Sequence, residues 1–170
     1  MPILASVLTN APKDKDRSLQ LANRLTSVAV WPVTVTLMLG APFFLSLYGA
    51  DFSSAWPVFL IMMGATGVNL LNSSAGSLML AKGAMVASLV NSALSSVFII
   101  AIVATTLSRW ELYSVSTATL VCNLISTIGI VLYAIGRLEF PVTVGRNIIG
   151  SSLALTGVTT LLFVAYTAFL

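Results

Sequence analysis

Four asparagines within long apolar stretches are the side chains best able to bind a polar ligand in this chain. Asn69 and Asn72 lie in residues 55–80, and Asn91 and Asn123 lie in the two stretches that follow. A side-chain amide both donates and accepts hydrogen bonds, and each of these capacities must be satisfied in hydrocarbon. Two interpretations stay open: the asparagines join helices, or they line a hydrophilic cavity that handles a polar head group.

Small and hydroxyl-bearing residues recur at helical spacing beside these asparagines. The clearest stripe has one such residue every four positions, at Ala84, Ser88, Ser92 and Ser96. For serine and threonine we favour packing, because a hydroxyl can bond back to a carbonyl of its own helix. The stripe therefore predicts that a neighbouring helix approaches closely, and that leucine at Ser92 disturbs this packing.

Charged and nucleophilic residues offer few other sites. Arg24 and Lys82 are placed to meet an anionic phosphate at the inner membrane face, although membrane topology alone accounts for both. The sequence has no histidine and one cysteine, Cys122. Nucleophile–base pairs, phosphate-binding loops and metal-ligand spacings do not occur in it. We therefore expect no catalytic site, no metal and no cofactor, and a protein that is not an enzyme.

The elements that carry these residues follow from composition. Of the 170 residues, 58% are hydrophobic and 8% are charged, whereas soluble domains carry about 25% charged residues. Uncharged stretches cover residues 25–50, 52–81, 83–108, 112–136 and 147–170. Each is longer than the roughly 20 residues that cross a bilayer core. The sequence predicts an all-α, polytopic transmembrane helical bundle.

Charge positions divide the chain into two parts. Residues 1–24 form an expected cytoplasmic loop and interfacial segment, and residues 25–170 form the expected transmembrane bundle. We predict five membrane-spanning helices, at about 25–48, 55–80, 84–107, 113–135 and 147–169. All five acidic residues lie outside the uncharged stretches, so no acidic pair is expected at membrane depth.

The basic residues predict the orientation of these helices. Seven of the eight fall on one side of the membrane when successive helices alternate in direction; they are Lys13, Lys15, Arg17, Arg24, Lys82, Arg137 and Arg146. Because cytoplasmic loops are enriched in Lys and Arg, the N-terminus is expected in the cytoplasm and the chain in the cell inner membrane. Scattered over separate loops, these charges indicate topology rather than a nucleic acid partner.

Several short motifs resemble one family of membrane transporters. Residues 2–6 (Pro-Ile-Leu-Ala-Ser), before a charged segment and a long span, resemble the proline-leucine-serine loop of polysaccharide flippases. Residues 40–42 (Gly-Ala-Pro), with 47–52 and 55–58, are similar to the outer turn of oligosaccharide exporters in the multidrug/oligosaccharidyl-lipid/polysaccharide superfamily. Residues 75–83 resemble that family's small-residue helix end and basic turn. Residues 107–113 depart from the family, which often has proline, an aromatic residue and glycine there.

The resemblance implies a function and partners. It implies the carboxyl-terminal lobe of a flippase that translocates lipid-linked oligosaccharide for cell-surface polysaccharide biosynthesis by alternating access. The residues expected at the substrate are Asn69, Asn72, Asn91, Asn123, Arg24 and Lys82. Five helices cannot enclose the family's central cavity, so we expect a missing amino-terminal lobe or a second copy. The alternatives are a cation-coupled multidrug exporter of the same superfamily, or a non-transporting membrane subunit or fragment.

Overall fold

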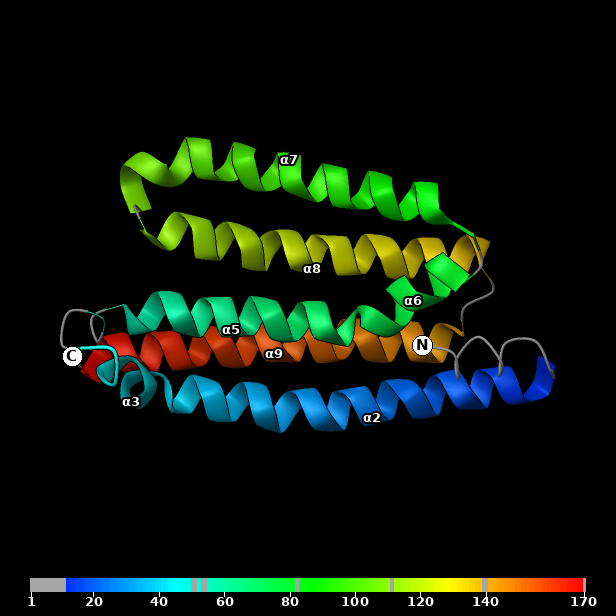
Figure 1. The fold of residues 1–170 in the computed structure, drawn as a ribbon, viewed down its shortest axis with the longest axis horizontal. Helices are drawn as coiled ribbons and strands as arrows, with labels where there is room; N and C mark the ends of the chain where they lie inside the picture. The colour runs from blue at the N-terminus through cyan, green and yellow to red at the C-terminus, as the bar shows by residue number, and fades with distance from the viewer. Residues whose placement is uncertain are drawn as a thin grey trace.

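The computed structural model describes residues 12–49, 52, 55–81, 83–110, 112–138 and 141–169. Within these ranges it describes side chains from Gln20 onward, except at 22, 74, 78, 81, 108–110, 112 and 169. All regular secondary structure in these ranges is helical (Figure 1). The predicted all-α class is therefore confirmed. Lys82 lies outside the described residues, as does the motif at residues 2–6.

Within the described ranges, three helices are long and apolar enough to cross a membrane. They are α7 (Met85–Trp110), α8 (Leu112–Arg137) and α9 (Val142–Phe169), and their apolar parts run over Met85–Leu107, Tyr113–Arg137 and Val142–Ala168. Successive helices run in opposite directions along a single long axis (Figure 1). These three helices support the general expectation of a membrane protein, whereas the first two expected spans are each divided into two helices.

The first expected span, 25–48, is divided near Gly40. Helix α2 (Pro12–Leu39) begins within the segment expected at the interface and runs through residue 25, and α3 (Ala41–Ser46) continues at an angle. Pro42 lies in the first turn of α3, and a proline removes one N–H group and crowds the carbonyl four residues earlier. The bend therefore follows from Pro42, with the backbone N–H of Phe44 still donating to the Gly40 carbonyl oxygen at 2.9 Å.

The second expected span, 55–80, bends at Asn72. Helix α5 (Trp56–Leu71) ends there and α6 (Ser73–Ala81) leaves at an angle to it (Figure 1). The Asn72 N–H donates to the Val68 carbonyl oxygen at 3.2 Å, and the Gly76 N–H donates to the Asn72 carbonyl oxygen at 3.1 Å. The junction is therefore a bend that keeps its hydrogen bonds rather than an unwound gap.

Gly83 ends α6 through its backbone conformation. Its φ is +74°, which glycine adopts without the steric penalty of a Cβ atom. The Ala84 N–H donates to the Met79 carbonyl oxygen at 2.9 Å, and the Gly83 N–H to that of Leu80 at 3.1 Å. This pair of bonds is the Schellman arrangement that closes a helix with glycine, and it turns the chain into α7.

Helix α5 lies at the centre of the bundle and contacts α2, α8 and α9. Glycines permit the close approach: a Cβ atom added at Gly67 would lie 2.5 Å from Leu155 Cδ2 and 3.1 Å from Thr34 Cγ2. One hydrophobic cluster fills this region, with Val30, Met38, Trp56, Leu60, Val68, Leu71 and Leu155. Trp56 also packs against Tyr166 of α9, with ring centroids 4.7 Å apart. The central packing thus depends on small residues along α5.

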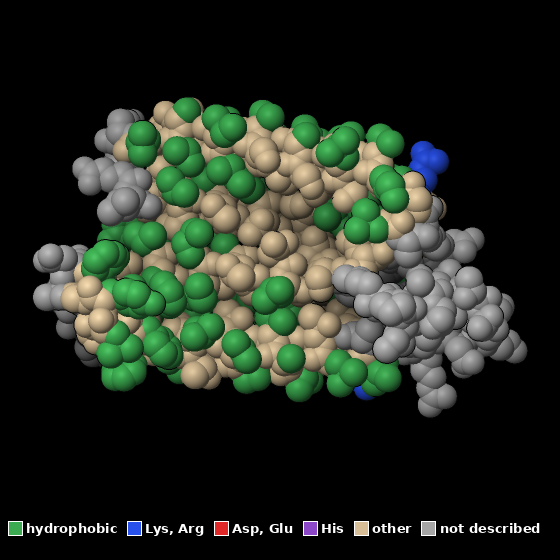
Figure 2. Space-filling model, in the orientation of Figure 1, with side chains coloured by type: hydrophobic (Ala, Val, Ile, Leu, Met, Phe, Trp, Pro, Cys, Tyr) green, Lys and Arg blue, Asp and Glu red, His purple; other side chains and the backbone are tan. Residues whose placement is uncertain are grey.

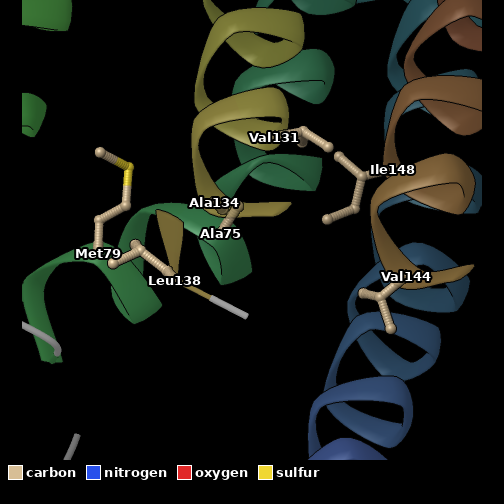
Figure 3. Close-up of a cluster of buried hydrophobic side chains, with 7 residues drawn as sticks. All are labelled: Ala75, Met79, Val131, Ala134, Leu138, Val144 and Ile148. Carbon is tan, nitrogen blue, oxygen red and sulfur yellow. The ribbon is translucent and has the colours of Figure 1, made fainter. Parts of the chain in front are cut away.

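A second hydrophobic cluster lies where α6 and α8 end and α9 begins (Figure 3). Its buried side chains are Ala75, Met79, Val131, Ala134, Leu138, Val144 and Ile148. Arg24, Arg137 and Arg146 are exposed near the same end of the bundle, which we call the basic end. On the face shown in Figure 2, the described Lys and Arg side chains appear only toward the end where α2 and α9 begin.

The predicted packing stripe on α7 is only partly correct. Ser88 and Asn91 are half-buried, but Ser92 and Ser96 are exposed. Residues four apart on an α-helix are rotated by about 40° relative to each other. Three such steps therefore carry the stripe out of the contact with α8. Within the described chain, Ser92 therefore lies outside the contact between α7 and α8, and the expected effect of leucine at this position stays a prediction.

Candidate functional site

Two of the four candidate asparagines join helices. Asn91 Nδ2 donates to Ser126 Oγ at 2.6 Å and connects α7 to α8. Asn123 Nδ2 donates to the Ala65 carbonyl oxygen at 3.0 Å and connects α8 to α5. Both side chains are half-buried. In these positions the amides hold neighbouring helices together.

Asn72 behaves differently because the fold leaves its amide oxygen without a partner. Its side chain is 7% exposed, and its Oδ1 is buried without a hydrogen bond at the bend between α5 and α6. Asn69, one turn earlier, is exposed on the surface of the described chain. The four asparagines therefore do not converge on one cavity, and Asn72 is the one that retains an unused acceptor inside the bundle.

Arg24 lines a polar pocket of about 190 Å³ at the basic end. The pocket lies between α2 and α9; its lining residues are Gln20, Asn23, Arg24, Thr143, Val144 and Asn147. Asn23 is only 4% exposed, and its Oδ1 is buried without a hydrogen-bond partner. We call this cavity the basic-end pocket. It combines a guanidinium, three amides and a hydroxyl within one small space.

A larger cavity of about 450 Å³ lies between α5, α8 and α9 toward the opposite end of the bundle. Its lining residues are Ile61, Tyr113, Thr117, Leu120, Thr159, Thr160 and Phe163. Each threonine hydroxyl donates to a carbonyl oxygen of its own helix: Thr117 to Tyr113 at 2.7 Å, Thr159 to Leu155 at 2.8 Å and Thr160 to Thr156 at 2.9 Å. This cavity, the apolar groove, suits a hydrocarbon chain better than a sugar.

Two serines in the described ranges also carry buried polar atoms without partners. Ser114 Oγ and Ser152 Oγ are buried and unbonded, together with the amide oxygens of Asn23 and Asn72. A helical serine hydroxyl reaches a carbonyl of the preceding turn by rotating about χ1. An amide oxygen accepts but does not donate, so Asn23 and Asn72 need donors from elsewhere.

Sequence reasoning missed most of the basic-end pocket. Gln20 and Asn23 precede Arg24 by one turn or less, and Thr143 and Asn147 flank Arg146 on α9. Polar amides at helical spacing beside an interfacial arginine were the available signal. Among the described residues, no group of three or more His, Cys, Asp or Glu side chains is arranged to hold a metal ion.

Comparisons with known proteins do not assign a family or a function to this chain. No family model, curated protein or solved structure matches the chain.

Proposed function

We propose that this chain forms the carboxyl-terminal lobe of an exporter that moves a lipid-linked oligosaccharide across the cytoplasmic membrane by alternating access. Its partner in this proposal is a second lobe, either an amino-terminal one or another copy of the chain. The N-terminus lies on the cytoplasmic side, with the basic end facing the cytoplasm in accord with the distribution of Lys and Arg.

The observation that carries this proposal is the bent helix formed by α5 and α6. The bend keeps its backbone hydrogen bonds, so the polar group that it presents inside the bundle is a side-chain amide rather than free backbone groups. Asn72 lies at the bend, 16 residues after Trp56, which is about 24 Å along the helix. Its buried oxygen has no partner. A polar head group that passes the bend supplies the missing donor.

The apolar groove supports a cargo that is part lipid. A lipid-linked sugar has a polar head and a long hydrocarbon chain, so its carrier needs polar contacts for one part and an apolar path for the other. The groove has hydroxyls committed to their own helices and lies toward the opposite end of the bundle from the basic-end pocket.

The motifs that resemble the flippase family also have structural roles. Gly40 and Pro42 lie at the bend between α2 and α3, and Gly83 closes α6 with a positive φ. Residues 75–81 lie in α6, which contacts α7 and α8, and Ala75 and Met79 are buried there. Each of the five residues named here lies where a helix bends, ends or packs closely, as a shared backbone framework requires.

Transport by a complete assembly containing this chain tests the proposal. Inside-out membrane vesicles are loaded on their outer surface with a radiolabelled lipid-linked oligosaccharide, and the fraction protected from an added glycosidase is measured over time. Protection that grows only in vesicles containing the chain is the expected result. Accumulation of a cationic dye inside the vesicles without glycan protection identifies the multidrug alternative, and the absence of both activities beside a second lobe identifies a non-transporting subunit.

A further inference from the structure

We propose that the basic-end pocket binds a lipid head group that carries a phosphate ester and free hydroxyls. The inference does not depend on transport, because the binding is measured on the isolated chain. It begins from Asn23, which is 4% exposed and has an unpartnered amide oxygen beside the cavity. A buried acceptor without a partner is costly, and a ligand hydroxyl satisfies it by donating a hydrogen bond.

The beginning of α9 supplies donors for an anion. The Val144 and Gly145 N–H groups donate to the Pro141 carbonyl oxygen at 3.0 and 3.1 Å. The N–H groups of Val142 and Thr143 come earlier and have no acceptor within the helix. Thr143 and Val144 both line the pocket, so the positive end of the α9 dipole faces it.

Arg24 supplies the charge that a phosphate needs. Its side chain is exposed and lines the same pocket as Thr143 and Asn147. No acidic side chain is among the described lining residues. A guanidinium forms two parallel hydrogen bonds to a phosphate, and such charge-assisted bonds are about twice as strong as neutral ones. The anion is thus met by Arg24 from α2 and by the first turn of α9.

The combination of groups selects a hydroxylated phosphate rather than a bare one. An ionised phosphodiester has acceptors but no donor, and therefore leaves Asn23 Oδ1 unsatisfied. Gln20 and Asn147 add amides that both donate and accept. A head group with a phosphate and neighbouring hydroxyls satisfies both kinds of partner, and a cavity of about 190 Å³ limits the ligand to a small head group or part of a larger one.

The position of the pocket indicates a lipid rather than a soluble phosphate. The apolar part of α9 begins at Val142, immediately beside the lining residue Thr143. The pocket therefore lies where an apolar helix emerges from the hydrocarbon layer, which is the depth of lipid phosphates. Val144 forms part of the pocket and of the hydrophobic cluster below it, so a bound head group has apolar surface beside its lipid chains.

Native mass spectrometry of the detergent-solubilised chain tests this site with three probes. Short-chain phosphatidylglycerol offers phosphate, hydroxyls and tails; short-chain phosphatidylmethanol, a phosphodiester of the same charge, lacks the free hydroxyls; glycerol 3-phosphate lacks the tails. We expect phosphatidylglycerol to bind most tightly, with Arg24→Ala weakening it about tenfold, as expected for loss of charge-assisted bonds. Arg146→Ala is the matched control, because Arg146 is exposed near the same end but does not line the pocket.

Asn23→Ala tests the hydroxyl contact separately. We expect this variant to lose the preference for phosphatidylglycerol over phosphatidylmethanol, while its circular dichroism spectrum and melting temperature confirm the fold. The proposal is overturned if Arg146→Ala weakens binding as much as Arg24→Ala, since general surface charge then explains the result. It is also overturned if the wild-type chain binds glycerol 3-phosphate as tightly as the lipid, or phosphatidylmethanol as tightly as phosphatidylglycerol.

Discussion

The apolar groove and the basic-end pocket contain related residue types but present opposite surfaces. Threonines line the groove, and their hydroxyls are already bonded to carbonyl oxygens of their own helices. Amides line the pocket, and the Asn23 oxygen is buried without a partner. The number of polar residues around a cavity therefore does not determine its polarity. What matters is whether the local helix can satisfy them.

The same distinction separates the amides themselves. Asn91 and Asn123 each donate a hydrogen bond from Nδ2 to a neighbouring helix, whereas Asn72 and Asn23 each have a buried Oδ1 without a hydrogen-bond partner. A satisfied amide stabilises a helix contact, and an unsatisfied one is available to a ligand. The predictions that follow test this division, from the largest expected change in stability to the smallest.

Gly67→Leu should cause the largest loss of stability. A Cβ atom at this position would lie 2.5 Å from Leu155 Cδ2 and 3.1 Å from Thr34 Cγ2. A leucine side chain therefore overpacks the contact, and overpacking costs about 1–3 kcal/mol. Unfolding in detergent, followed by circular dichroism, measures the effect. Gly157→Leu on α9 is the control, because a Cβ there meets nothing within 4 Å; equal destabilisation by both changes contradicts the close contact of α5 with α9.

Asn91→Ala should cause a smaller loss. It removes the bond to Ser126 Oγ, and hydrogen bonds between membrane helices contribute about 0.6 kcal/mol on average. Ser92→Ala, one residue along and exposed, should leave the free energy of unfolding unchanged. A larger effect at Ser92 than at Asn91 means that another face of α7 packs on α8.

Thr117→Val should have the smallest effect, although Thr117 lines the largest cavity described. Its hydroxyl bonds within α8, so its replacement by a methyl leaves the surface of the groove apolar. We expect a change in the free energy of unfolding within about 0.5 kcal/mol, measured by the same melts. A loss as large as that of Asn91→Ala indicates that the hydroxyl has a partner beyond its own helix.

The sequence predicted the helical class and the three helices that are long and apolar enough to cross a membrane, because these depend on local composition. Charges and Gly83 mark the ends of α7, α8 and α9, and the apolar residues between them satisfy the length that a membrane requires. The divisions within the first two expected spans were harder to predict from the sequence. Pro42 was visible as a source of bending, but Asn72 is not a recognised helix breaker, and its bend depends on how α6 packs against α7 and α8.

The candidate site was predicted only in part, because its residues come from distant parts of the chain. Arg24 was identified from its charge, but Thr143 and Asn147 lie more than a hundred residues later. Sequence spacing identifies the face of one helix and does not specify which face of another helix meets it. For the same reason, sequence spacing does not settle the roles of Asn91 and Asn123. Their partners, Ser126 and Ala65, are given by the structure.

The central claim is that a buried amide without a partner serves the cargo, whereas one with a partner serves the fold. Its most direct test compares Asn72→Leu with Asn123→Leu in a complete transporter, by measuring surface glycan per folded molecule. We predict that Asn72→Leu lowers this ratio, whereas Asn123→Leu lowers the amount of folded protein and leaves the ratio unchanged. An unchanged ratio for Asn72→Leu, or an equal fall for both variants, would contradict the account.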